Sequence, residues 1–214
     1  MLSQDFKSWA RQVLAGNWGA AIAVCLVADL MSLGVNVLDM VQSGGAVTWL
    51  ALISSLIFGV LISGVTTLGI AYYFTNLVAD RGAQFKNLFE PFRYLGKAIW
   101  MNTVIFCYIF LWSLLFVIPG IIAMYRYAMV PYLIAEFPDL SVSEAMEESA
   151  RLMNGNKMRL FSLQFSFIGW VLLAVIATFG IGMLWVTPYM HAADAAFYME
   201  VTGRSGLRYQ KTLE

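Results

Sequence analysis

Four ionisable side chains lie inside otherwise apolar stretches and are the residues best placed to do chemistry or to bind a ligand: Asp29, Arg126, His191 and Asp194. A charged group at the centre of a membrane costs at least about 2.5–3.5 kcal/mol unless it is paired or hydrated. His191 and Asp194 are three residues apart, so a helix places them on one face. We expect Arg126 to pair with Asp29 or Asp194. The cluster predicts either a polar path or anionic-ligand site, or an internal ion pair that fixes the register of the helices.

The other polar groups in these stretches have simpler expected roles. Gln164 is predicted to form an interhelical hydrogen bond rather than to bind a ligand, and Glu136 lies near a helix end from which it can reach the membrane interface. Cys25 and Cys107 lie in apolar runs, without a CxxC spacing or a neighbouring metal ligand. Both cysteines are expected to be packing residues.

Motifs of soluble enzymes do not occur in the sequence. It contains no HExxH, no glycine-rich phosphate loop, no G-x-S-x-G and no cysteine–histidine cluster. The longest charged segments, 79–97 and 136–159, are too short to fold as a catalytic domain. We therefore expect no catalytic, cofactor-binding or metal site, and no enzyme activity.

The composition points to lipid as the main solvent of the chain. Of the 214 residues, 60% are apolar and 12% are charged, against roughly 45–50% and roughly 25% in soluble domains. This combination excludes a disordered chain, a nucleic-acid-binding protein and an ordinary cytosolic enzyme. The formal net charge is zero, so no overall field steers a charged partner.

Six apolar segments have the length expected of membrane helices, and they pair into three hairpins: 18–41 with 46–78, 98–118 with 121–135, and 160–178 with 183–200. The second hairpin depends on Pro119-Gly120. Without a break there, residues 98–135 would form a rod of about 57 Å, nearly twice the apolar thickness of a bilayer. Proline and glycine together favour a reversal at this point.

Charge placement supports the same threading. Of the 13 basic residues, 12 fall in segments 1–17, 79–97, 136–159 and 201–214, which six helices place on one side. The positive-inside rule identifies that side as cytoplasmic, so both termini are predicted to be cytoplasmic. The fold class is therefore all-α: a polytopic bundle of six membrane helices in three hairpins.

A short amphipathic segment precedes each hairpin, with apolar residues at helical spacing in 2–14, 85–95 and 142–153. Ser141 and Glu144 have the spacing of a capping box at the start of the third. The three copies indicate either an internal repeat or a shared need for a surface helix before each hairpin. The repeat-like units are 1–78, 79–135 and 136–203, with a cytoplasmic tail at 204–214, all within a single membrane domain spanning 1–214.

Small residues recur every four positions along the second membrane helix, at Ser55, Gly59, Ser63, Thr67 and Ala71. Such a row allows a neighbouring backbone to approach closely, which is how helices associate in lipid. We expect this helix to be central and the row to serve packing.

Several parts of the sequence resemble one bacterial family. They are 14–19 (LAGNWG), 111–122 (LWSLLFVIPGII) with the following Tyr125, Tyr127 and Met129, Ser149 to Phe161, 166–170 (SFIGW), and 180–182 with Leu184-Trp185 and Pro188-Tyr189. They are similar to membrane proteins catalogued as domain of unknown function 975. The resemblance implies a polytopic protein of the bacterial cytoplasmic membrane, and it implies no activity. A looser similarity extends to the membrane portion of certain glycerophosphodiesterases, whose catalytic domain has no counterpart here.

Together these patterns predict a non-enzymatic integral membrane protein that acts through lateral contacts with membrane lipid or partner proteins. A membrane-protein partner or a homo-oligomer is compatible with six short helices, and nucleic acid is not an expected partner. The alternative is a small transporter, or a resistance or immunity factor that handles an amphiphilic molecule, with the intramembrane charges lining its path.

Overall fold

The computed structural model describes residues 3–42 and 49–203, and over these residues the prediction of an all-helical fold is confirmed. The structure is 83% helix and contains no strand in this part of the chain. The predicted turn after Gln42, most of the loop to the second membrane helix, and the predicted tail at 204–214 lie outside the described residues.

Eleven helical elements follow one another in the described chain: α1 (Ser3–Leu14), α2 (Trp18–Gln42), α3 (Trp49–Val78), the 3₁₀ helix η1 (Phe85–Tyr94), α4 (Leu95–Leu115), α5 (Val117–Arg126), α6 (Val130–Glu136), α7 (Val142–Leu152), α8 (Lys157–Phe165), α9 (Ile168–Thr178) and α10 (Met183–Val201). The predicted helices at 18–41, 46–78, 98–118 and 183–200 correspond to α2, α3, α4 and α10. The predicted helix at 121–135 spans parts of α5 and α6, and the one at 160–178 spans parts of α8 and α9.

The break between α5 and α6 is stabilised by a side chain from a distant helix. Pro131, in the first turn of α6, has no N–H with which to continue the ladder toward Tyr127. The hydroxyl of Ser149 on α7 donates to the backbone oxygen of Arg126 at 2.8 Å and accepts from the N–H of Met129 at 3.3 Å. Backbone groups freed by the break therefore have a buried partner.

The sequence predicts a reversal at Pro119-Gly120, but the helical chain breaks three residues before Pro119, at Phe116. Phe116 is extended, with φ −162° and ψ 154°, and Pro119 lies in the first turn of α5, where a missing N–H breaks no helical bond. The two helices then lie side by side. A side chain at Gly120 would collide with Ser113, whose Cα atom lies 3.1 Å from the position of a Cβ, so glycine permits this close approach.

Helix α3 is central, as predicted, and it packs against α2, η1, α4, α6 and α10. Its closest approaches are not those of the predicted row. A Cβ at Gly64 would lie 2.7 Å from the backbone oxygen of Ala98, and one at Gly69 would overlap the carbonyl of Leu88, whereas a Cβ at Gly59 would meet nothing within 4 Å. Of the predicted row, Ser63 accepts a hydrogen bond from Asn102 on α4 at 2.8 Å and Ala71 is buried.

Two of the three amphipathic segments bury their apolar faces inside the protein instead of leaving them for the membrane. On α1, Phe6, Trp9 and Leu14 are buried, and the Phe6 ring packs 5.4 Å from that of Phe197 on α10. On α7, the whole predicted stripe is buried, and it consists of Val142, Ala145, Met146, Ser149 and Met153.

The predicted stripe of the second segment does not form one buried face. This segment is a 3₁₀ helix containing Pro91, and it leaves Phe85, Phe89 and Phe92 more than 40% exposed while burying Leu88. A 3₁₀ helix has three residues per turn instead of 3.6, so the predicted α-helical stripe does not stay on one side.

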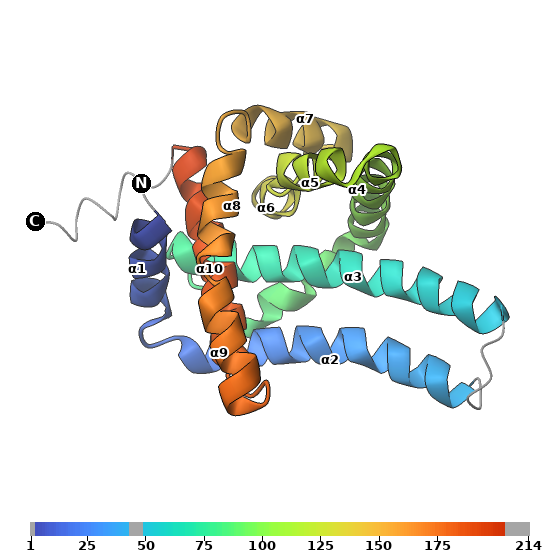
Figure 1. Ribbon diagram of the computed structural model, residues 1–214, viewed down its shortest axis with the longest axis horizontal. Helices are drawn as coiled ribbons and strands as arrows, with labels where there is room; N and C mark the ends of the chain where they lie inside the picture. Colours follow the sequence, from blue (N-terminus) through green and yellow to red (C-terminus); the bar gives the residue numbers. More distant parts are fainter. Residues whose placement is uncertain (1–2, 43–48, 204–214) are drawn as a thin grey trace, which may run out of the picture.

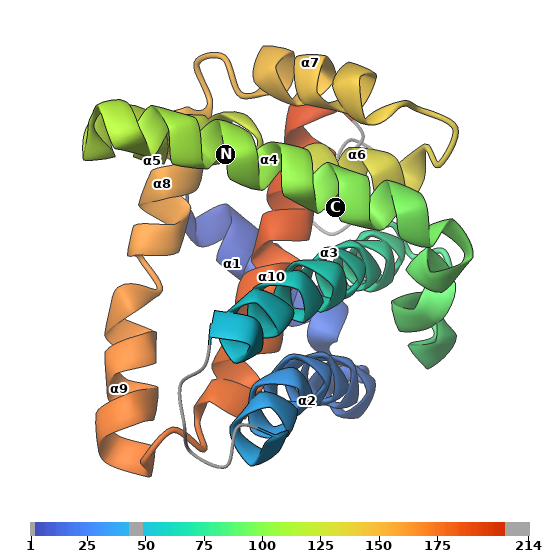
Figure 2. The ribbon, with the colours of Figure 1, turned by 90° about the vertical axis from the view of Figure 1, so that its right-hand side faces the viewer.

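The hairpins do not form a single parallel bundle. The pair α2 and α3, the pair α4 and α5, and α9 with the start of α10 extend from a common core in three different directions (Figures 1 and 2). The core includes α1, α6, α7, parts of η1 and α8, and the inner ends of the longer helices. Each described arm is therefore joined to the core at one end, and many apolar side chains on the outer lengths of α4, α5 and α9 are exposed.

Candidate functional site

His191 and Asp194 are brought together as predicted, and both line a cavity of about 200 Å³. The cavity lies among α3, α6, α8 and α10. The amide of Gln164 donates to Oδ2 of Asp194 at 3.4 Å, and the Tyr125 hydroxyl donates to Oε1 of Gln164 at 3.0 Å. Gln164 thus joins α5, α8 and α10, which confirms its predicted role as an interhelical hydrogen-bonding residue. The His191 ring packs 5.6 Å from that of Phe74.

Arg126 and Asp29 do not join this pair. Arg126 ends α5, is exposed, and has its Cζ atom 5.7 Å from the centre of the Tyr127 ring. Asp29 is exposed on α2. Within the described residues, no ion pair joins Arg126 to Asp29 or to Asp194, so the predicted four-residue cluster is divided. The reason is the break after α5, which turns Arg126 toward α7.

Arg126 instead lines an open groove of about 800 Å³ between α4 and α7, which we call the α4–α7 groove. Its α4 wall includes Lys97, Trp100 and Tyr108, and its α7 wall includes Met146 and Glu147. Trp100 is 61% exposed and Tyr108 is 46% exposed. The groove therefore combines two cations, one carboxylate and an aromatic rim.

Two sets of local hydrogen bonds position α7 as a wall of the groove. Lys97 Nζ donates a hydrogen bond to the backbone oxygen of Pro138, in the segment that leads into α7. The predicted capping box is confirmed, since Ser141 N–H donates to Oε2 of Glu144 at 2.8 Å and Ser141 Oγ accepts from the N–H of Glu144 at 3.3 Å. Hydrogen bonds from Ser141, and to a smaller extent the charge of Lys97, hold the pKa of the exposed Glu144 carboxyl below its usual value.

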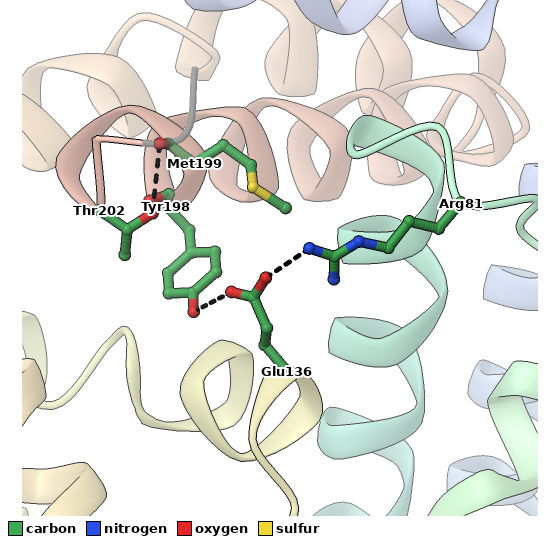
Figure 3. Close-up of polar contacts among 5 residues, drawn as sticks. All are labelled: Arg81, Glu136, Tyr198, Met199 and Thr202. Atoms are coloured by element: carbon green, nitrogen blue, oxygen red, sulfur yellow. Dashed lines mark hydrogen bonds and ion pairs between the residues drawn. The ribbon is translucent and has the colours of Figure 1, made fainter. Parts of the chain in front are cut away.

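The Glu136 carboxylate is enclosed in the core, whereas the sequence predicts that it reaches the membrane interface. Its side chain is 4% exposed. Figure 3 shows Arg81, from the loop after α3, donating to Oε1 at 2.8 Å and the Tyr198 hydroxyl donating to Oε2 at 2.7 Å. Tyr198 also stacks on Tyr132, with ring centres 5.5 Å apart. The arrangement ties α3, α6 and α10 together.

The signal for this network in the sequence was weak. Glu136 ends an apolar run, but Arg81 lies 55 positions away from it and Tyr198 lies 62 away. No group of three or more His, Cys, Asp or Glu side chains gathers at metal-binding distances among residues 3–42 and 49–203. Of the two cysteines, Cys25 is buried as predicted, whereas Cys107 is exposed on α4.

Three helical stretches in the described residues are long and apolar enough to cross a membrane, and they are Phe85–Leu115, Val117–Glu136 and Lys157–Thr178. A bent pair, α1 with the described start of α2, passes the same test if it is taken as one span. The apolar surface of these stretches is largely open, as expected of a chain whose solvent is lipid.

Comparisons with known proteins assign no activity to this chain. Neither the comparison with curated proteins nor that with solved structures returns a match. Residues 96–205, which hold α5 to α10 and nearly all of α4, match a family described as protein of unknown function (DUF975). The match covers just over half of the chain, and the protein belongs to this family.

Proposed function

We propose that this protein is an integral membrane protein that acts without catalysis, through lateral contacts of its apolar arms with lipid and neighbouring membrane proteins. The observation that carries the proposal is the tip of the α4–α5 arm, where Leu114 to Ile118 are five consecutive apolar residues, each 63–72% exposed. On α9 and the turn after it, Ile176 is 73% exposed and Phe179 is 95% exposed. Surfaces of this kind on a monomer mark a membrane or partner contact.

We further propose six membrane spans, with both termini on the cytoplasmic side of a bacterial cytoplasmic membrane. The turns at 116–120 and 179–182 carry no charged residue, whereas η1, α7 and the segments beside them carry most of the charges. This separation fits the positive-inside rule. The three arms would then lie in one hydrocarbon layer while the core of short helices stays at the cytoplasmic face.

The native thiol of Cys107 offers a direct test of the lipid contact. A nitroxide on this exposed α4 residue, in a Cys25→Ala background, should collide more often with oxygen than with a water-soluble nickel chelate. The matched control is the same label at Asn154, an exposed residue just after α7, where the order should be reversed. Water-like accessibility at Cys107 in reconstituted protein would contradict the proposal.

The six-span topology is tested with cysteines at Phe179 and Ser143 in a chain that lacks Cys25 and Cys107. A membrane-impermeant maleimide added to intact cells should label Phe179→Cys from outside and should label Ser143→Cys only after lysis. Labelling of both from the same side would exclude the topology.

A second candidate function is a small transporter, or a resistance or immunity factor, that handles an amphiphilic molecule. The observation in its favour is the cavity of about 200 Å³ that contains His191 and Asp194. A cysteine at Thr67, which lines this cavity, should react with a small charged thiol reagent if the cavity is hydrated from one side of the membrane. A thiol that stays unreactive in reconstituted protein would count against transport through it.

A further inference from the structure

We propose that the α4–α7 groove binds the headgroup of a phospholipid that carries both a phosphate and a primary ammonium, as in phosphatidylethanolamine. Arg126 and Lys97 contact the phosphate, and Glu147 contacts the ammonium. The proposal rests on the proposed lipid contact of the arms and deepens it by naming the lipid chemistry.

The charges in the groove are of opposite sign but are kept apart. Arg126 and Glu147 both line the groove, yet neither forms an ion pair with any described residue. Other acid–base neighbours in the protein do pair, as Arg159 and Glu200 do at 2.9 Å. Opposite charges that line one groove without neutralising each other complement a ligand that carries both signs.

The donors in the groove suit a phosphate. The guanidinium of Arg126 presents a planar fork of N–H groups that matches phosphate oxygens, and it lies beside the Tyr127 ring. Lys97 gives one N–H to the Pro138 carbonyl, which leaves two further donors on its ammonium group. On the other wall, the Glu147 carboxylate accepts hydrogen bonds, so it favours a primary ammonium over a quaternary one that has no N–H.

The residues around the α4–α7 groove suit the acyl chains of a lipid as well as its headgroup. Trp100 and Tyr108 border the groove, and amphipathic rings of this kind are enriched where hydrocarbon meets water. Beyond Tyr108, the same face of α4 continues with exposed Leu111 and Leu115, which offer an apolar surface for acyl chains. One helix therefore carries both parts of the site.

The test measures lipid binding to the full-length protein in detergent by native mass spectrometry. The probes are phosphatidylethanolamine, phosphatidylglycerol and phosphatidylcholine with identical acyl chains. The wild type should bind phosphatidylethanolamine most tightly. Arg126→Gln should weaken binding of all three lipids, by about fivefold if one interfacial charge has its usual effect, and Arg126→Lys should restore part of the loss.

Glu147→Gln separates the two halves of the headgroup. It should remove the preference for phosphatidylethanolamine over phosphatidylglycerol, and it should weaken phosphatidylcholine binding less than phosphatidylethanolamine binding, because a quaternary ammonium loses the attraction of the charge but no hydrogen bond. Arg93→Gln and Glu148→Gln are the controls, and neither should alter the lipid preference. Arg93 is an exposed cation on η1. Glu148 pairs with Arg151 and does not line the α4–α7 groove, whereas Glu147 lines both this groove and the one beside Glu148. Circular dichroism checks that each variant is folded.

Three results would overturn the inference: a preference for phosphatidylglycerol that Glu147→Gln strengthens, equal binding of the three lipids, or variants that behave as their controls do. If the Cys107 label still reports lipid in these cases, the proposed function stands and only the headgroup assignment fails. If Cys107 reports water, the proposed function fails as well.

Discussion

The hydroxyl of Tyr198 donates to Oε2 of Glu136 at 2.7 Å, and this contact joins α10 to the end of α6 inside the core. Tyr198→Phe removes the donor but keeps the ring that stacks on Tyr132. We expect the free energy of unfolding to fall by about 1–3 kcal/mol, because a buried carboxylate oxygen loses a partner. Thermal or denaturant unfolding in detergent measures the change.

The matched control for this change is Tyr94→Phe, which removes the same hydroxyl from a tyrosine that is 41% exposed on η1. It should alter stability by less than the core variant. Arg81→Gln should also lower stability, because it takes the charged partner from the same carboxylate, which is 4% exposed. The Arg81 side chain is 49% exposed, so solvent screening limits the loss. Equal effects of Tyr94→Phe and Tyr198→Phe would show that the buried contact contributes nothing specific.

Gly69 on α3 tests the close packing between α3 and η1. Gly69→Ala should lower stability by about 1–3 kcal/mol, since its Cβ would overlap the Leu88 carbonyl and lie 3.1 Å from its carbon, which is backbone and cannot turn aside. Gly59→Ala on the same helix meets nothing within 4 Å and should be neutral or slightly stabilising. The melting temperatures of the two variants are compared with that of the wild type. Similar values for both variants would rule out close packing at Gly69.

Gly120 tests the reversal between α4 and α5. Gly120→Ala should destabilise the protein, because its Cβ would collide with the Ser113 side chain and lie 3.1 Å from the Ser113 Cα atom. Adding Ser113→Ala should recover only part of the loss, since the backbone contact remains. Gly169→Ala in α9, with open space around it, is the control and should not lower the melting temperature.

The capping box of α7 predicts a dependence on pH. Because Ser141 hydrogen bonds lower the pKa of Glu144 in the folded protein, this contribution to stability is fully present above the ordinary value of 4.5. It is lost as the pH falls through the lowered pKa. Ser141→Ala should therefore speed amide hydrogen exchange in α7 at neutral pH, and its difference from wild type should shrink in acid.

Glu147→Gln is the control for the pH experiment, since Glu147 lies on the same helix outside the capping box. It should leave hydrogen exchange at the start of α7 unchanged at neutral pH. A Ser141→Ala effect that stays constant from neutral to acid pH would show that Glu144 does not act through the cap.

Periodicity and local caps could be predicted from the sequence because the residues that carry them are close together. The buried stripe of α7 and the pair Ser141 and Glu144 were both visible as spacings within one helix. The central place of α3 was also predicted, although its closest approaches are at Gly64 and Gly69, outside the row that suggested it. Which glycine of α3 lies against a neighbouring backbone depends on how the neighbouring helix is aligned along α3, and a single sequence does not give that alignment.

The candidate site could be predicted only where its residues share an element. His191 and Asp194 meet because they are one helical turn apart on α10. The predicted pairing of Arg126 with Asp29 or Asp194 is wrong, because the chain breaks after Arg126. That break is stabilised by Ser149, which lies on α7, 23 positions away in the sequence. Long-range pairs of this kind, like the contact of Arg81 with Glu136, leave no spacing that a single sequence can reveal.

The position of α10 also sets an order on assembly. Ala192, Ala193, Ala195 and Ala196 to Met199 are buried, and this helix packs against α1, α2 and α3, which are made first. A ribosome must therefore translate nearly two hundred codons before the earliest helices can find their final neighbour. Until α10 is made, the faces of α1, α2 and α3 that it covers lack their final neighbour.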